Sequence, residues 1–392
     1  MQFIDNLKDE LEKIKNKNLY RTPLKPSGLD FSSNDYLGLS GHRDVINEFK
    51  KGIEEFGSGS TASRLIRGHR DIFEIFEYEF AKLVKSDSSL LVANGYVANL
   101  GLIDSISDPA TIIFTDRLNH ASIIDGIRIS GAIKKYYNHL DMDHLEELLE
   151  KSPIKSKKII ISETVFSMDG DIAPIKHLIE FRNKYNACLL LDEAHAIGVF
   201  GTEGGGICRD KSFLDESLLE CVDFRIFTGG KSLGLEGGII ASSAIGKEYL
   251  INTMRPFIFS TAPIPALPYA LLKSTELIKS MDLERERILK NSEYLKNGFK
   301  ELNLNILNSG SQIIPVVLYD PARTLSFAKS LRDNGFDIKA IRPPTVKDSR
   351  LRISINSIKC LIGAMSPSML KTVSEMIIFL DLIGDFSNNS SR

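Results

Sequence analysis

The chain has 392 residues, more than a single compact core usually organises, so its length suggests two domains. Hydrophobic residues make up 43% of the chain and charged residues 26%, as in ordinary soluble globular proteins. The net charge of −2 argues against a basic surface that would bind nucleic acid or an anionic membrane.

The four cysteines, Cys188, Cys208, Cys221 and Cys360, are scattered and form no CxxC pair. This spacing argues against a disulfide framework or a zinc site and is typical of a reducing compartment. The N-terminus predicts a charged amphipathic helix rather than a signal peptide, and no run approaches the roughly 20 apolar residues of a membrane span. We therefore expect a cytoplasmic protein with no bound metal.

After the N-terminal helix, a segment rich in Pro and Gly at residues 23–28 leads into a short strand and turn residues. From residue 87 to about 243, short apolar runs alternate with segments of helical period. The runs are SSLLVA, TIIFTD, KKIIISE, ACLLLDE, DFRIFTG and GGIIASS. Apolar strands joined by helical crossovers predict an α/β fold with a mostly parallel sheet that is covered on both faces.

A long charged helix is expected to begin near residue 282, followed by a smaller α/β domain. Its expected strands are LNILN, QIIPVVLY, GFDIKAIR and LRISIN, and ARTLSFAKSLRDN is an expected helix. The polar tail FSNNSSR predicts disorder. The predicted segments are an N-terminal helix and arm over 1–40, a large domain over 41–280 and a small C-terminal domain over 281–385.

Polar residues follow the apolar runs at five points, and ligands of open parallel sheets bind beyond the carboxyl ends of the strands. These points are Asn94 to Tyr96, Asn119 and His120, Glu163 to Asp169, Asp192 to His195, and Thr228 to Lys231. Any one of them alone would be read as a solvated turn. Together they predict one shared site.

Asp192 and Lys231 indicate the chemistry of that site, because they follow two successive predicted strands. A pyridoxal-phosphate (PLP) enzyme needs a lysine that binds the cofactor as a Schiff base. It also needs a carboxylate that keeps the pyridine nitrogen protonated, so that the ring accepts electrons from the substrate α-carbon. The alternatives are a helix N-cap for Asp192 and an exposed loop for Lys231, but the flanking TGG and SLG predict a tight loop.

Other residues at the strand ends suit the same cofactor. His195 could reach the phenolic oxygen of PLP, and His120 could stack on the ring and transfer protons. Gly95 and Tyr96 open a predicted helix, whose backbone N–H groups suit a phosphate. Hydroxyl groups for the phosphate or the ring oxygen come from Ser167 and Thr228. Structural hydrogen bonds or turns are the alternative for each of them.

Two motifs suggest other functions, but the sequence around each motif argues against that function. Asp192 to His195 spells DEAH, and GKS at 230–232 resembles the end of a P-loop, but position 225 is Arg225 where a P-loop needs glycine. A P-loop should also precede its DEAH strand. GSGSTA at 57–62 matches a relaxed dinucleotide fingerprint, but it follows a helical pattern and leaves a nicotinamide dehydrogenase only as a weak alternative.

Nine stretches carry a family resemblance from about residue 20 to 360. They are FSSNDYLGLS, GSGSTASRLIRG, ANGYVAN, DRLNHASIIDG, ETVFSMDGDIAPI, DEAHAIGVFG, FTGGKSLG, FSTAPIP and AIRPPTVKDSRLRISIN. Together they resemble the α-oxoamine synthases, fold-type I PLP enzymes related to aminotransferases. The resemblance implies a PLP-dependent transferase fold like that of aspartate aminotransferase, and a decarboxylative condensation of an amino acid with an acyl thioester.

FSTAPIP, and AIRPPTV followed by RLRIS, resemble the branch that serves biotin synthesis. That branch implies condensation of L-alanine with a pimeloyl thioester to give 8-amino-7-oxononanoate, carbon dioxide and the free thiol. Coenzyme A and an acyl-carrier protein both stay open as carriers. The alternatives are a relative that uses glycine, serine or a longer acyl thioester, and an inactive homologue kept as a binding subunit.

The resemblance also implies roles, carried over position by position. Lys231 would hold PLP and remove the α-proton, while Asp192 would pair with the ring nitrogen and His195 with the ring oxygen. His120 would stack on the ring. Further cofactor contacts would come from Gly95, Tyr96, Ser167 and Thr228.

Thr261 would reach the phosphate of the neighbouring subunit's cofactor, which implies a homodimer with its active site at the interface. Asn34 and Arg352, with His120, would bind the amino-acid carboxylate, for which a guanidinium fork is well suited. Arg21 and Thr345 match positions near the acyl substrate.

The chain departs from the family pattern at four points. Phe73 stands where members often have histidine, and Ala62 stands where glycine is usual. Glu236 is unusual so near the lysine, and the segment between Arg21 and Phe31 is short, as if a small hairpin were missing. The departures concern the acyl chain more than the PLP chemistry.

Overall fold

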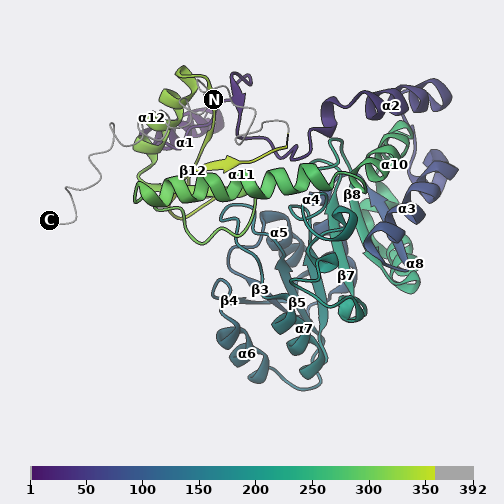
Figure 1. Ribbon diagram of the computed structural model, residues 1–392. Helices are drawn as coiled ribbons and strands as arrows, with labels where there is room; N and C mark the ends of the chain where they lie inside the picture. The colour runs from purple at the N-terminus through teal and green to yellow at the C-terminus, as the bar shows by residue number, and fades with distance from the viewer. Residues whose placement is uncertain (1, 358–392) are drawn as a thin grey trace. The chain divides into compact units, whose positions relative to one another are not determined.

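The computed structural model describes residues 2–357, which divide into two compact units (Figure 1). The large unit comprises residues 34–167 and 172–286. The small unit comprises residues up to 33, residues 168–171 and the chain from 287 onward. The chain therefore passes between the units four times.

The large unit is built on a seven-stranded sheet with the strand order β2-β8-β7-β6-β5-β3-β4. Its strands are β2 (Ser88–Val92), β3 (Ile112–Asp116), β4 (Ile133–Tyr137), β5 (Lys158–Glu163), β6 (Cys188–Asp192), β7 (Phe224–Thr228) and β8 (Gly238–Ser242). Only β8 runs antiparallel to its neighbours, and the other pairs are parallel. The predicted α/β fold with a mostly parallel sheet is thereby confirmed.

Four helices connect strands of this sheet, and the other helices of this part of the chain precede β2 or follow β8. The connecting helices are α4 (Gly95–Ile106), α5 (Ala121–Ser130), α6 (Met142–Glu150) and α7 (Ile175–Lys184). The others are α2 (Arg43–Phe56), α3 (Asp71–Val84), α8 (Ala244–Thr253), α9 (Arg255–Phe259), α10 (Ala266–Ile278) and α11 (Asp282–Glu301). Short helical turns lie at Leu39–Gly41, Arg64–Gly68, Thr202–Gly204, Ile207–Arg209 and Glu216–Cys221. The last part of α11, from residue 287, belongs to the small unit.

The core of the large unit explains why its strands read as continuous apolar runs. Ile159 and Ile161 of β5 are fully buried and pack with Leu190 of β6 against one layer, which includes α4, α5 and α8. Ile160 and Leu191, which alternate with them along the strands, are just as buried. A strand that is covered on both faces is mostly apolar on both, and this removes the alternation seen in half-exposed strands.

The small unit combines an antiparallel sheet with helices. Its elements are α1 (Gln2–Asn16), β1 (Leu29–Asp30), β9 (Ile313–Tyr319), α12 (Pro321–Asp333), β10 (Phe336–Asp337), β11 (Lys339–Ile341) and β12 (Ser349–Ser354). The sheet order is β11-β12-β9, and β1 pairs in parallel with β10. Helix α12 packs against these strands, and Asp320 caps it by accepting a hydrogen bond from the Arg323 amide.

The prediction of a strand at LNILN is wrong. After α11 ends at Glu301, the chain turns through Asn303 and Leu307, both of which have positive φ angles (56° and 54°). Left-handed backbone at both ends of the segment is incompatible with an extended strand. The predicted tail disorder, Cys360 and the last part of the predicted 281–385 domain lie outside the described residues.

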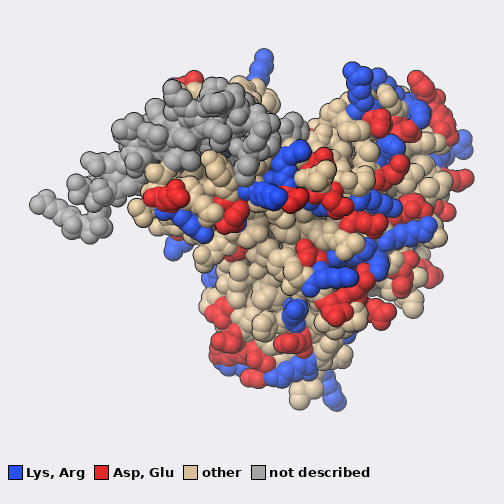
Figure 2. All heavy atoms as spheres, in the orientation of Figure 1, with Lys and Arg blue, Asp and Glu red and all other residues tan. Residues whose placement is uncertain are grey.

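Charged side chains of both signs are interspersed over the face drawn in Figure 2. This pattern agrees with the near-balance of 49 basic and 51 acidic residues in the sequence. Within residues 2–357, we find no helix with the length and apolar character needed to cross a bilayer.

Truncation of Ile161 tests whether β5 is buried on both faces. The Ile161 side chain is 0% exposed, so Ile161→Ala should destabilise the protein by about 2–5 kcal/mol, through lost burial and the cavity that remains. Ile154→Ala is the matched control, because Ile154 is 95% exposed and should cost less than about 0.5 kcal/mol. Urea denaturation of both variants measures the difference, and equal costs would contradict the described packing.

Candidate active site

Lys231 lies in a tight loop that follows β7. The Gly234 amide donates a hydrogen bond to the Lys231 carbonyl (2.8 Å) and closes the loop. The Lys231 amine Nζ is 2.9 Å from Nε2 of His195, and the His195 side chain is buried. The sequence prediction of a tight loop is confirmed, and the loop presents Lys231 to a histidine.

Asp192 ends β6, the parallel neighbour of β7. One carboxylate oxygen accepts a hydrogen bond from the Ala194 amide (2.9 Å), and the other accepts one from Nδ2 of Asn99 (2.7 Å). The carboxylate is therefore held at both oxygens in a buried position. Asn99 was missed by sequence reasoning, although its place one helical turn after Gly95 was a signal that it faces the same site.

His120 caps the N-terminus of α5 and accepts a hydrogen bond from the Ser122 amide through Nδ1 (3.2 Å). Its ring meets that of Tyr96 edge to face, with 6.2 Å between ring centroids. The Tyr96 hydroxyl donates to Asp125. Although part of the His120 surface is exposed, surrounding groups displace water and lower its pKa; the Asp192 carboxylate opposes this shift and Lys231 adds to it.

Glu163 ends β5 opposite Asp192 in the parallel register. It is buried, and its carboxyl accepts a hydrogen bond from the Ser167 amide (3.1 Å). Burial, followed by repulsion from Asp192, raises the pKa of Glu163 to about 8, and Lys231 acts in the opposite direction. Glu163 is therefore protonated at neutral pH, so this sheet edge does not carry two buried negative charges.

The start of α4 and the end of β7 approach each other closely. The Asn94 side chain caps α4 by accepting from the Val97 amide (2.9 Å). A Cβ atom on Gly95 would lie 3.3 Å from Cβ of Thr228. The Thr228 hydroxyl donates to the Gly237 carbonyl (3.1 Å) and accepts from the Gly230 amide (3.2 Å). The predicted phosphate contacts Gly95 and Thr228 are therefore neighbours in the structure.

These residues fit the predicted cofactor. A carboxylate, an amine and two histidines share one sheet edge, beside the N-terminus of a helix whose backbone N–H groups can bind a phosphate. Two buried polar atoms there, Oδ1 of Asn99 and Oε1 of Glu163, have no hydrogen-bond partner among the described residues. Such orphaned atoms in an otherwise bonded cluster suit a polar ligand.

The predicted substrate residues are distributed over both units. Asn34 belongs to the large unit and accepts a hydrogen bond from the Tyr36 hydroxyl (3.1 Å). Arg352 lies in β12 of the small unit, where it is buried and donates to the Ser354 hydroxyl (2.7 Å). Arg21 donates to the Pro343 carbonyl (3.1 Å), and Thr345 is exposed in the same unit. Their roles stay predictions.

Thr261 lies on the surface of the large unit, in a loop held by the family stretch at 57–68. The Ala262 amide donates to the Ala62 carbonyl (3.0 Å), and the Ser60 hydroxyl donates to the Pro263 carbonyl (2.5 Å). Ala62 therefore contributes its backbone to this loop. The loop presents Thr261 to solvent.

The other departures have local explanations. Phe73 is fully buried, and its ring lies 4.6 Å beneath the Arg64 guanidinium, so an aromatic ring serves there as a packing surface. The Glu236 side chain points to solvent, and its backbone packs so tightly on Gly229 that a Cβ there would overlap the Glu236 carbonyl. Neither side chain is part of the ionisable cluster around Lys231.

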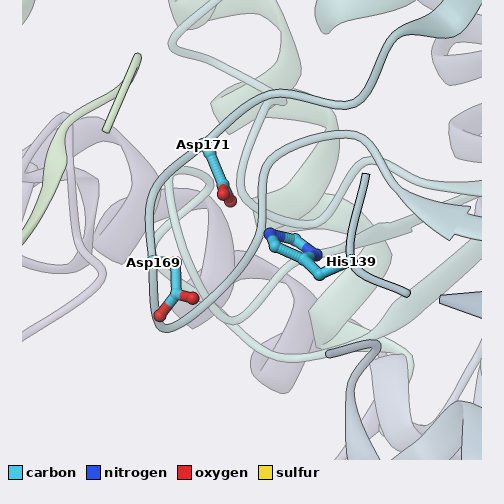
Figure 3. Close-up of side chains that lie close together, drawn as sticks. All are labelled: His139, Asp169 and Asp171. Atoms are coloured by element: carbon cyan, nitrogen blue, oxygen red, sulfur yellow. The ribbon is translucent and has the colours of Figure 1, made fainter. Parts of the chain in front are cut away.

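Figure 3 shows three side chains of metal-ligand type, His139, Asp169 and Asp171. His139 has a protein partner in Asp116, whose Oδ1 lies 2.9 Å from its Nδ1. Asp169 accepts a hydrogen bond from Arg350 within the small unit. Protein partners therefore account for these two groups, and we assign no metal to them.

The chain matches known proteins over most of its length. Residues 26–359 match the family model of aminotransferase class I and II. A Bacillus cereus (strain ATCC 10987 / NRS 248) protein named as an 8-amino-7-oxononanoate synthase is 40% identical over 84% of this chain and 83% of its own. A Bacillus anthracis protein of the same name is 39% identical over the same shares.

Two solved structures are similar over both units. Serine palmitoyltransferase from S. paucimobilis, solved with a bound PLP–myriocin aldimine, has a TM-score of 0.87 and 26% identity and covers 98% of each chain. 8-Amino-7-oxononanoate synthase from Francisella tularensis has a TM-score of 0.76 and 26% identity, over 91% of this chain and 98% of that one. The chain therefore belongs to the aminotransferase class I and II family and, within it, to the α-oxoamine synthases that its sequence resembles.

Proposed function

We propose that this protein is a PLP-dependent acyltransferase that condenses L-alanine with a pimeloyl thioester, giving 8-amino-7-oxononanoate, carbon dioxide and the free thiol. One observation carries the chemistry. Asp192 ends β6, Lys231 lies in the loop after the neighbouring parallel strand β7, and His195 is hydrogen-bonded to Lys231. The 40% identity to the Bacillus cereus protein supports the choice of substrates.

Lys231 would hold the cofactor covalently, and its amine would then take the α-proton of the amino acid. PLP, when bound, supplies a ring that accepts the electron pair left on the substrate α-carbon. Asp192 would hold the proton on the ring nitrogen, which keeps the ring electron-poor. Asn99 and the Ala194 amide fix the Asp192 carboxylate for this task, since each donates to one of its oxygens.

The neutral form of Glu163 favours this assignment to Asp192. Two buried carboxylates on adjacent strand ends would compete for one proton, and burial resolves the competition by raising the pKa of Glu163. We infer that Asp192 carries the charge that faces the ring nitrogen, while Glu163 keeps its own proton. The carboxyl of Glu163 then orders the backbone near Ser167, because it accepts a hydrogen bond from the Ser167 amide.

Arg352, Asn34 and His120 would hold the amino-acid carboxylate. The bond that breaks must stand perpendicular to the ring, so the carboxylate must be held one way for loss of the α-proton and another way for loss of carbon dioxide. A guanidinium fork binds a carboxylate through two hydrogen bonds and suits such a clamp. Arg352 donates to Ser354 within its own strand, which limits the rotation of its side chain.

Gly95, Tyr96, Ser167 and Thr228 would contact the cofactor around its phosphate and ring oxygen. Thr261 would serve the cofactor of a second copy of the chain, which makes a homodimer part of the proposal. The exposure of Thr261 on the large unit supports this role, because an exposed side chain is accessible to a second copy of the chain. Arg21 and Thr345 would lie near the acyl substrate, carried by coenzyme A or by an acyl-carrier protein.

A second candidate function is condensation of serine with a longer acyl thioester. The similarity to serine palmitoyltransferase favours it, since the TM-score of 0.87 over 98% of this chain exceeds the 0.76 of the Francisella enzyme. Sequence identity to the two solved enzymes is the same, at 26%. The 40% identity to the Bacillus protein keeps alanine and the pimeloyl group as the first candidate substrates.

The covalent role of Lys231 predicts a single labelled peptide. Borohydride reduction of the protein with PLP should fix the cofactor to Lys231, as seen by peptide mass spectrometry. Lys231→Ala should lose turnover by several orders of magnitude, because the cofactor link and the α-proton base vanish together. Lys151→Ala, at an exposed surface lysine, is the control and should be labelled at Lys231 like the wild type. Labelling at another lysine would overturn the assignment.

The raised pKa of Glu163 predicts a pH-dependent stability. The folded protein holds this proton up to about pH 8, whereas the unfolded chain releases it near the ordinary value of 4.5. The free energy of unfolding should therefore fall as pH rises from 4.5 to 8, since each pKa unit is worth about 1.4 kcal/mol.

Comparison with Glu163→Gln isolates this contribution, because the amide mimics the protonated carboxyl and does not titrate. In cofactor-free protein, the stability of wild type relative to the variant should fall by more than about 1 kcal/mol between pH 5 and pH 8. Glu150→Gln, at an exposed position, should show no such change. A constant difference between wild type and Glu163→Gln would show that Glu163 is ionised throughout.

Substrate choice is tested by release of free thiol across a grid of alanine, serine and glycine with pimeloyl and longer thioesters. Each acyl group is offered on coenzyme A and on acyl-carrier protein. Alanine with a pimeloyl thioester should give the fastest release, and Lys231→Ala should give none. If serine or glycine is faster with the pimeloyl thioester, the assigned substrates are wrong. Release with no pair would favour an inactive homologue.

A further inference from the structure

Three hydrogen bonds run in series from Asn34 to Lys231. The Tyr36 hydroxyl donates to Oδ1 of Asn34 (3.1 Å) and lies 2.7 Å from Nδ1 of His195. On the other side of the ring, Nε2 of His195 lies 2.9 Å from Nζ of Lys231. Tyr36 is fully buried and His195 nearly so, and all four residues belong to the large unit.

The direction of each hydrogen bond follows from the number of protons. An ammonium group only donates, so Nε2 of His195 must accept from protonated Lys231. A neutral imidazole then carries its proton on Nδ1 and donates it to the Tyr36 oxygen. The single hydroxyl proton of Tyr36 is left for Asn34, which is the direction found in the structure. The series has one consistent arrangement of protons when Lys231 is charged.

Close backbone packing holds these segments in place. A Cβ atom on Gly198, three residues after His195, would lie 2.6 Å from Cβ of Ser232 and 3.1 Å from Cδ1 of Leu37. On Gly234, a Cβ atom would overlap the Ser40 amide. The segments that carry Tyr36, His195 and Lys231 therefore touch one another at glycines, where a larger residue would force them apart. The two glycines therefore allow the close approach of the segments that carry the hydrogen-bonded side chains.

We propose that Tyr36, acting with Asn34, is a positioning residue that keeps the neutral His195 ring protonated on Nδ1. In this tautomer the Nε2 lone pair faces Lys231. Nε2 then takes a proton from the Lys231 ammonium: an N–H bond of Lys231 breaks, an N–H bond forms on Nε2, and the electron pair stays on Nζ. The resulting neutral amine can attack the aldehyde carbon of PLP. This role rests on the proposed function of Lys231 in binding the cofactor.

Nitrogen-15 NMR of labelled histidines tests the tautomer without any cofactor. Lys231→Ala removes the ammonium, so the tautomer of His195 in the cofactor-free chain no longer depends on Lys231 and reports on the hydrogen bond with Tyr36. The signals of His195 are assigned by their loss in His195→Asn. We expect Nδ1 to carry the proton in Lys231→Ala, and the proton to move at least partly to Nε2 when Tyr36→Phe or Asn34→Ala is added.

Two outcomes would overturn the proposal: a proton on Nε2 in Lys231→Ala itself, or the same tautomer after either added substitution. The five histidines other than His195 and His120 report on folding, because their signals should not change when Tyr36→Phe or Asn34→Ala is added. Asn34→Ala keeps the Tyr36 ring in place, so it answers the question if Tyr36→Phe does not fold. The NMR result needs neither PLP nor turnover, and it therefore stays interpretable if the proposed reaction is wrong.

A second readout follows the capture of PLP by Lys231, trapped with borohydride at successive times. Tyr36→Phe should slow the capture by about tenfold or more, as expected for loss of an oriented proton acceptor. Tyr137→Phe is the control for loss of a buried tyrosine hydroxyl, since Tyr137 is also buried in the large unit, at the end of β4. Equal capture rates in the two variants would show that Tyr36 has only a structural role.

Discussion

Backbone hydrogen bonds between β5, β6 and β7 set the positions of the two carboxyl groups, Glu163 and Asp192, at the proposed catalytic edge. The parallel register places Glu163 opposite Asp192, and Asp192 opposite Ile226, two residues before β7 ends at Thr228. Because the strands are buried on both faces, a slip in register would move charged groups into the apolar layers. The backbone of the sheet therefore fixes the spacing of the two carboxyl-bearing residues, whatever rotamers their side chains adopt.

The same burial decides how each charge is held. A buried carboxylate is stable only if donors satisfy it or if it keeps its proton. Asp192 takes the first route, through Asn99 and the Ala194 amide. Glu163 takes the second, with a raised pKa. The two solutions stand side by side, since Glu163 and Asp192 are register partners on adjacent strands.

The groups of the proposed chemistry lie in one unit, whereas the proposed substrate residues are divided between the two, with Asn34 and His120 in the large unit. The groups around Lys231 all lie in the large unit, whereas Arg352, Thr345 and Arg21 lie in the small unit. The solved relatives include a serine palmitoyltransferase and an 8-amino-7-oxononanoate synthase, so one fold is shared by enzymes with different substrates. We infer that substrate choice depends on a few side chains outside the ionisable cluster, whereas the cluster itself serves the reaction common to the family.

The sequence by itself determined the fold class and the strand ends that carry chemistry. Continuous apolar runs between helical segments predicted the buried parallel sheet, because strands covered on both faces are mostly apolar along their length. Asp192, Lys231 and Gly95 could be placed from sequence, since each lies next to a strand end or opens a helix. Departures such as Phe73 were visible only as mismatches to a family.

Only the tertiary structure decided which distant residues complete the site. Tyr36 lies 159 positions from His195 and Asn99 lies 93 positions from Asp192, so no local pattern links them. The tertiary fold also decided the protonation of Glu163, because its pKa depends on burial and on the charge of Asp192. The strand expected at LNILN failed for a related reason, since left-handed turns at Asn303 and Leu307 override its apolar pattern. The hydrophobic pattern of a segment shows which of its residues can be buried. Its strand pairing and the pKa values of its buried groups depend on the residues that the fold brings next to it.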